Sequence, residues 1–294
     1  MMIRKNGYFI ALCGGLILSF DTVIIRAIDL PMMQVTFWRS LSMALPMLLW
    51  MLFNMLRSKQ INYLKIKSNK SFALAAVFYG LSSVLFPVSA MSTSIANMLF
   101  IIATAPLWAA IFAWFFLSEK IHPVTLITFI FSIFGILTVL GGVDNLTMDS
   151  LRLGDVTAIA TAMSMAAAFV VGRQSKADLS LAPSFGSILA TVCLFVVYDI
   201  DFNINISQFA LIILEGSIVV FLALSLIAKA SRLISPPHLG LFLLLESVLA
   251  PIWIWLTYGD VPSEGTIYGG IVILLSIITN SAYFIKKKEI NKGH

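Results

Sequence analysis

Charged residues are scarce in this chain. Asp, Glu, Lys and Arg make up 11% of its 294 residues, whereas soluble globular proteins carry roughly 25%. Hydrophobic residues make up 60%, and the mean hydropathy is +0.98. A soluble core of this size cannot enclose so much apolar surface, so much of that surface is expected to face lipid. The composition therefore excludes an ordinary soluble fold and favours an all-α membrane protein.

Cysteine and histidine are also rare. Cys13 and Cys193 lie in apolar runs and form no CxxC spacing, while His122, His238 and His294 are far apart in sequence. These absences exclude a disulfide framework and predict neither a metal site nor a cofactor. No GxxxxGK[ST] phosphate-binding loop occurs, which excludes ATP-driven transport by this chain.

Long apolar runs fill the sequence instead. A membrane-spanning helix needs about 20 mostly apolar residues. The first run continues beyond the apolar core of a signal peptide, so it is predicted to be a retained helix. Ten spans are predicted, at about 8–26, 33–53, 72–90, 94–117, 122–141, 154–172, 183–198, 208–228, 237–258 and 265–285.

Basic residues lie mostly on one side of these spans. The termini and the loops after even-numbered spans hold 16 of the 19 Lys and Arg residues, whereas the opposite loops hold only Arg26 and Arg152. Short basic loops face the cytoplasm, so both termini are predicted to be cytoplasmic in a bacterial inner membrane. The net charge of +5 then reflects contacts with lipid headgroups and does not predict nucleic-acid binding.

A weak internal repeat divides the chain into two halves, residues 1–145 and 146–294. Segment 107–126 aligns with segment 248–267, and this alignment pairs Trp114 with Trp255. Because each half contains five predicted spans, an odd number, the second half must be inverted relative to the first. Inverted repeats are typical of secondary transporters, which bind substrate between the halves.

Several motifs resemble one family of membrane proteins. They are FWRSLSMALP (37–46), ANMLFIIATAPLWAAIFAWFFLSEKI (96–121), FGILTVLGG (134–142) and LESVLAPIWIWLTYGD (245–260). With these motifs the chain resembles the EamA-type branch of the drug/metabolite transporter superfamily along essentially its whole length. The resemblance implies a ten-helix carrier of small metabolites and favours export over uptake.

Four ionisable residues lie inside predicted spans: Asp21, Arg39, Glu215 and Glu246. Each costs at least about 2.5–3.5 kcal/mol at the centre of the bilayer, so each needs a reason to be there. Arg39 could present a fixed cation to a carboxylate or phosphate group of a substrate. Alternatively it pairs with Asp21 or reaches lipid headgroups.

Glu246 lies near the middle of its span, with no basic neighbour in that span. A carboxyl group there could take up a proton from one side of the membrane and release it to the other, and Glu215 could play the same part. The alternative is a neutral carboxylic acid that hydrogen-bonds a neighbouring helix.

Further residues are candidates for substrate contact or for movement. Pro106 and Pro251 predict helix kinks that could line a cavity. Glu119 and Asp260 close spans at opposite faces and could contact a gate or a loop. The remaining candidates are polar or aromatic residues within spans, which could touch substrate or join helices: Trp108, Asn97 and Asn280.

Together these features predict a secondary carrier that works by alternating access. The expected substrate is a small organic metabolite that is amino-acid-like, aromatic or drug-like, and the expected partners are the lipid bilayer and, for coupling, protons. The chain is expected to act as a monomer or a homodimer and not as an enzyme. The alternatives are a membrane-embedded enzyme for lipid-linked substrates and a membrane scaffold or sensor.

Overall fold

Every element of the chain that the structure describes is a helix. The structure is a computed structural model that describes residues 2–56, 70–118, 122–139, 152–175, 179–230, 233 and 236–290. The elements in chain order are α1 (Met2–Leu18), α2 (Asp21–Ala27), α3 (Met32–Leu56), α5 (Lys70–Ser92), α6 (Ile95–Ile102), α7 (Ala105–Leu117), α8 (Pro123–Val139), α9 (Leu153–Gln174), α10 (Ala182–Val197), α11 (Ile206–Ile212), the π-helix η2 (Ile213–Val220), α12 (Phe221–Ala230), α13 (Pro236–Tyr258) and α14 (Glu264–Ile290).

Each of the ten predicted spans falls on a helix or on consecutive helices. Five helical segments of the described residues are both long and apolar enough to cross a bilayer. They are Gly7–Ala27, Lys70–Ser92, Ile95–Phe116, Leu153–Gly172 and Ile206–Ala230. The all-helical membrane architecture is therefore confirmed, while the full count of ten crossings stays a prediction.

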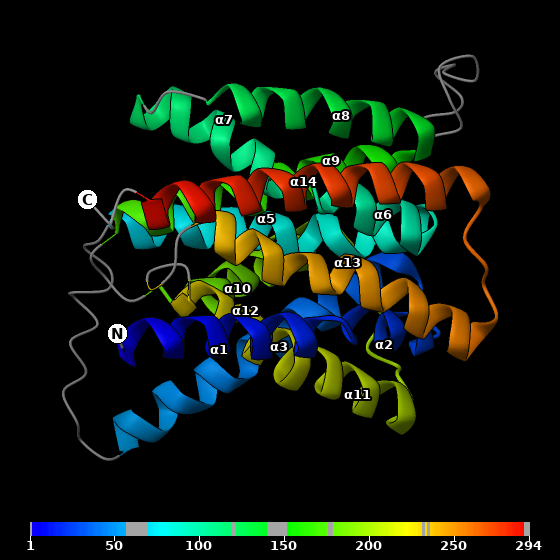
Figure 1. The fold of residues 1–294 in the computed structure, drawn as a ribbon. Coiled ribbons are helices and arrows are strands. Elements are labelled where there is room, and N and C mark those ends of the chain that lie inside the picture. The colour runs from blue at the N-terminus through cyan, green and yellow to red at the C-terminus, as the bar shows by residue number, and fades with distance from the viewer. Residues whose placement is uncertain are drawn as a thin grey trace.

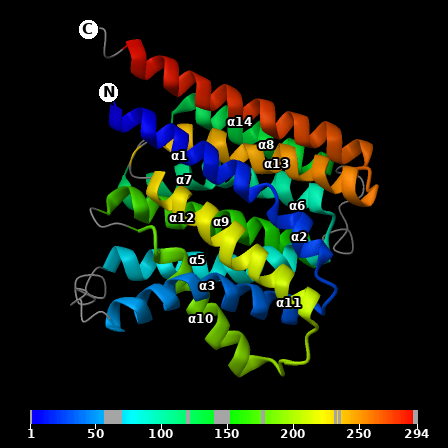
Figure 2. The same cartoon turned by 90° about the horizontal axis from the view of Figure 1, so that it is seen from below.

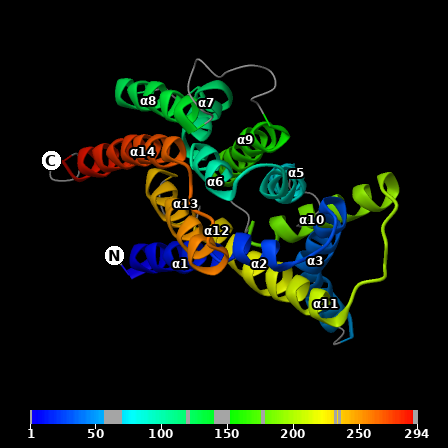
Figure 3. The same cartoon turned by 90° about the vertical axis from the view of Figure 1, so that its right-hand side faces the viewer.

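The helices run side by side along one common direction (Figure 1), and α1 begins at the same end of the bundle at which α14 ends. Seen along the bundle, α7 and α8 lie at one edge and α3 and α11 at the opposite edge (Figure 3). Helix α5 packs against both α9 and α10, and α8 packs against α14. Helix α1 lies against α12 and α13 (Figure 2).

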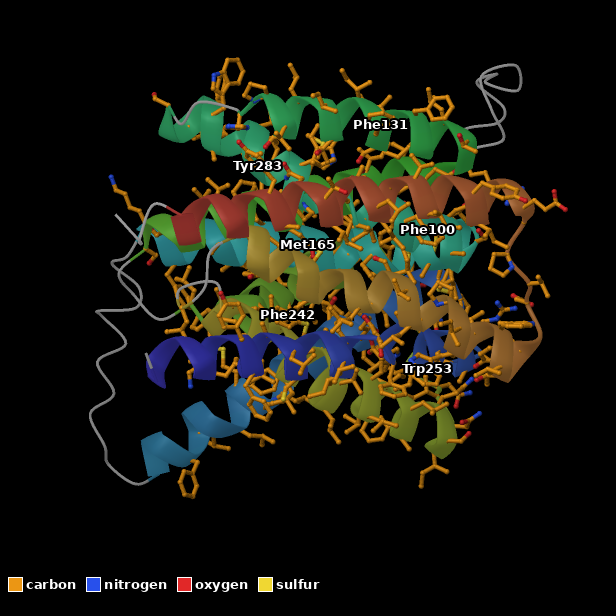
Figure 4. The ribbon with its side chains drawn as sticks, viewed as in Figure 1. Phe100, Phe131, Met165, Phe242, Trp253 and Tyr283 are labelled. Atoms are coloured by element: carbon orange, nitrogen blue, oxygen red, sulfur yellow. The ribbon has the colours of Figure 1, made fainter. Side chains whose placement is uncertain are left out.

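The outer faces of the bundle are apolar. On α8, the exposed side chains include Ile127, Ile130, Phe131 and Phe134, and Phe131 projects from the outer edge in Figure 4. Large apolar side chains exposed in such number would be costly in water. These faces suit contact with lipid acyl chains, so the hydrophobic surplus of the sequence lies where the bilayer is expected.

Small residues allow the closest helix crossings. Gly80 on α5 and Gly186 on α10 lie so close that a Cβ atom on either would collide with backbone atoms of the other helix. Gly15 on α1 meets the carbonyl oxygen of Phe242 on α13 in the same way. Glycine is used here because only a residue without a side chain permits backbones to approach this closely.

Three predicted spans are not regular α-helices. The first span is broken at Ser19–Phe20, between α1 and α2, and the fourth is broken at Ala103–Thr104, between α6 and α7. In the eighth span, η2 interrupts the helix. Pro106 was expected to kink a continuous helix, but it lies in the first turn of α7, where its missing N–H group is not needed. π-helical segments and breaks of this kind are frequent at functional sites.

Candidate functional site

The four ionisable residues predicted at membrane depth are all buried, and three of them, Asp21, Arg39 and Glu215, contact one another. Asp21 begins α2, Arg39 lies on α3, Glu215 on η2 and Glu246 on α13. Each is at most 4% exposed. Two residues come from each predicted half, so this group, called the central cluster below, joins the halves.

Arg39 is the centre of the cluster. Its Nη2 donates a hydrogen bond of 2.8 Å to Asp21 Oδ2, and its Nε donates to Glu215 Oε1. Its Nη1 lies 3.5 Å from the carbonyl oxygen of Ser83, and its guanidinium carbon lies 5.2 Å from the centre of the Phe86 ring. Arg39 therefore ties α2, α3, η2 and α5 together.

A tight crossing of η2 and α3 makes this contact possible. Gly216 follows Glu215, and a Cβ atom there would collide with the Ser42 hydroxyl and crowd the Arg39 carbonyl oxygen. The Ser217 hydroxyl donates a 2.5 Å hydrogen bond to the Ser42 carbonyl oxygen. The π-helical turn and Gly216 together place the Glu215 carboxyl group directly at the guanidinium.

The carboxyl groups of the cluster outnumber its single cation. Asp21 Oδ1, Glu215 Oε2 and Glu246 Oε1 are buried and accept no hydrogen bond. Glu246 forms no ion pair with another described residue. If all four groups were ionised, the cluster would carry a net charge of −2, which is costly away from water.

A cavity of about 1330 Å³ opens near the cluster, at the end of the bundle opposite the first residues of α1. Both predicted halves line it, and exposed residues such as Val261 surround it, so it communicates with the outside. Its lining comes from the end of α2 with residues 28–30, the junction of α5 and α6, the start of α9, and the end of α13 with residues 259–266.

The inner part of the cavity lies close to the cluster. The lining residue Ile25 follows Asp21 by four residues on α2, and Pro251 follows Glu246 by five on α13. At 1.5 Å per residue these separations are about 6 and 7.5 Å along the helix axes. The cavity therefore approaches the carboxyl groups to within about one to one and a half helical turns.

Polar contacts surround the cavity and link its walls. Arg26 pairs with Asp260 and lies over the Tyr258 ring at 4.8 Å, and Thr266 donates a 2.6 Å hydrogen bond to Asn97 Oδ1. Both contacts connect the first half of the chain with the second. Asp260, predicted to close a span, is thus a partner of Arg26 at the cavity mouth.

Other predicted residues lie elsewhere. Trp108 packs edge-on against Phe129, its Nε1 donates to Thr104 Oγ1 at 3.2 Å, and it does not line the described cavity. Asn280 accepts a 3.1 Å hydrogen bond from Thr125, which joins α14 to α8. Glu119 lies outside the described residues.

The described residues contain no group of three His, Cys, Asp or Glu side chains that could hold a metal ion. The described part of the site offers carboxyl groups, one guanidinium and the polar lining of the cavity. Such an arrangement can bind protons and charged or polar ligands.

Comparison with known proteins agrees with this architecture. One solved crystal structure, whose title names no function, is 13% identical, and its match covers 97% of this chain and 99% of that chain with a TM-score of 0.61. This likeness shows a shared fold alone. No curated protein matches the chain. The model of the EamA-like transporter family, which is part of the drug/metabolite transporter superfamily, matches residues 5–141 of the chain.

Proposed function

We propose that this chain is a secondary transporter that moves a small organic metabolite across the bacterial inner membrane by alternating access. The family is one of membrane transporters. The observation that carries the proposal is the cavity between the two halves, which reaches toward a buried charged cluster built from both. Movement of the halves about this cluster would expose the site to each side in turn.

Ten crossings in two inverted repeats are part of this proposal. Its support is that the aligned residues Trp114 and Trp255 are both 53% exposed, while the aligned pairs Ala109 and Ala250, and Thr125 and Thr266, are buried. Matching exposure at matching positions is what two copies of one unit would show.

The proposed topology places both termini in the cytoplasm, and the cavity then faces the periplasm. A reporter active only in the periplasm is expected to be inactive when fused after Lys288 and active when inserted near Asp149. The physical reason is the retention of basic segments on the cytoplasmic side. Periplasmic activity of the fusion at Lys288 would contradict the topology and the inverted repeat together.

The mixed polarity of the cavity supports the proposed substrate class. Hydroxyl, amide and charged side chains line it beside apolar ones such as Ile25 and Ile254. A small amino-acid-like, aromatic or drug-like molecule suits such a mixed surface. The direction of transport proposed is export, as the family resemblance favours, and coupling to protons through the central cluster is proposed to drive it. A monomer or a homodimer is proposed as the transporting unit.

A ligand screen tests the function. Amino acids, nucleosides, sugars and polyamines are added to the purified protein, and one class is expected to raise the melting temperature and to exchange across proteoliposomes. Ala90→Phe, which would fill part of the cavity, is expected to reduce both effects, whereas Ala210→Phe on the exposed face of α11 is the matched control. Equal transport by both variants would contradict a role for the cavity.

The alternative to a carrier is a membrane-embedded enzyme that acts on lipid-linked substrates. It would need its polar groups gathered at one membrane interface, whereas the central cluster is enclosed by protein. A scaffold or sensor has no need of a cavity leading to buried carboxyl groups. The geometry favours the carrier over both.

A further inference from the structure

The two carboxyl groups bound to Arg39 share one edge of its guanidinium. The Nε and Nη2 donors of arginine lie on the same edge of the planar group and usually hold both oxygens of a single carboxylate. Here Nη2 holds Asp21 and Nε holds Glu215, one oxygen each. The two carboxyl groups are therefore held at adjacent donors of one guanidinium.

This arrangement leaves one oxygen of each group without a donor. Asp21 Oδ1 and Glu215 Oε2 are buried and accept no hydrogen bond, and neither residue is more than 1% exposed. Two ionised carboxylates at this separation repel each other, and burial strengthens that repulsion. One arginine offsets only one negative charge, so a second positive charge is missing.

We propose that Asp21 and Glu215 share one proton on the guanidinium edge of Arg39, so that this pair is a proton-binding site that joins the two halves of the protein. The proton lies between the two carboxyl groups, supplies the missing hydrogen bond and makes the group of three residues neutral. Like-charged carboxyl groups in contact bind a proton for this reason. The inference rests on the proposed function and names the residues that would hold a coupled proton.

The described residues of the surrounding helices supply no second buried positive charge that could replace the proton. Helices α1, α2, α3, α11 and α12 pack against η2. Among the described side chains of these elements, Asp21 and Arg39 are the only buried ionisable groups, and Lys229 on α12 is exposed. Glu246 on α13 adds a further carboxyl group and no cation. Because no three metal-binding side chains of the described residues converge, a proton fits the gap better than a metal ion.

Movement between outward-facing and inward-facing states gives the proton a role. If α2 and η2 separate, Arg39 can keep only one of its two partners, and the carboxyl group that leaves must either retain the proton or release it to water. A proton held between elements of different halves is therefore bound in one state and exchangeable in the other, which is what coupling to a proton gradient requires.

Infrared spectroscopy of the purified full chain tests the proposal without any substrate. A protonated carboxyl group has a C=O stretching band apart from the amide bands, and that band shifts in D₂O. The wild-type protein is expected to show a component that Glu215→Gln and Asp21→Asn each remove, while Glu246→Gln, the matched control, retains it. Glu215→Asp keeps a carboxyl group and is expected to shift the component, which also serves if Asp21→Asn fails to fold.

The proposal is overturned if both Glu215→Gln and Asp21→Asn keep the complete wild-type band, or if only Glu246→Gln removes it. The first result would mean that both groups are ionised, and the second that Glu246 alone holds a proton. Failure of the proposed function looks different, because a protein that transports nothing in proteoliposomes could still show the shared-proton band.

Discussion

Replacing Arg39 with methionine is expected to destabilise the protein by about 3–5 kcal/mol, because it leaves buried carboxyl groups without their cation. Asp21 and Glu215 both point at this one guanidinium, and neither has another basic partner among the described residues. Thermal and chemical unfolding of the purified protein in detergent measures the effect. Arg39→Lys is expected to recover only part of the stability, since a single ammonium group cannot hold two carboxyl groups along one planar edge.

The matched control for this substitution is Arg26→Met. Arg26 also pairs with a carboxylate of the other half, Asp260, but the two side chains are 38% and 50% exposed. An exposed pair contributes about 0–1 kcal/mol because water and salt screen it. Equal destabilisation by Arg26→Met and Arg39→Met would contradict the central position of Arg39.

A double-mutant cycle separates the two roles open to Arg39. Combining Arg39→Met with Asp21→Asn is expected to cost clearly less than the two single effects together, because the contact is already lost in each single variant. Strong coupling in the absence of substrate supports a structural pair. If the effects add, Arg39 and Asp21 act independently, and a role of Arg39 in binding substrate gains support.

Much of the helical framework could be predicted from the sequence because a bilayer requires long apolar runs. The Asp21–Arg39 pair was also predictable, because the two residues lie on consecutive spans at similar depth. By contrast, the partner Glu215 follows Arg39 by 176 residues. No local pattern joins them, and only the packing of η2 against α3 brings them together.

The irregular helices could not be predicted for a different reason. The break at Ser19–Phe20 contains neither glycine nor proline, and the π-helical turn of η2 has the composition of an ordinary apolar helix. Pro106 did signal an irregularity, but its position in the first turn of α7 shows a helix start and not a kink. The cavity forms where the ends of several helices meet. No local pattern in the sequence predicts which helix ends will lie together.

Glu246→Gln is expected to abolish accumulation of substrate driven by a pH gradient, while folding and substrate exchange are retained. Glutamine has the shape of a neutral glutamic acid, so burial at 4% exposure on α13 should tolerate it. Glutamine cannot take up or release a proton, however. A carrier that moves one proton with each neutral substrate molecule can accumulate that substrate about tenfold per pH unit of gradient. This accumulation requires a coupling group that binds and releases the proton.

The measurement is uptake into proteoliposomes with an imposed pH gradient, compared with exchange in the absence of a gradient. Glu264→Gln, an exposed carboxyl group at the start of α14, is the matched control and is expected to accumulate substrate like the wild type. If Glu246→Gln also accumulates substrate at the wild-type level, Glu246 is not the proton carrier. Coupling would then rest on the proton shared by Asp21 and Glu215 alone, because Arg39 joins this pair of buried carboxyl groups across both halves.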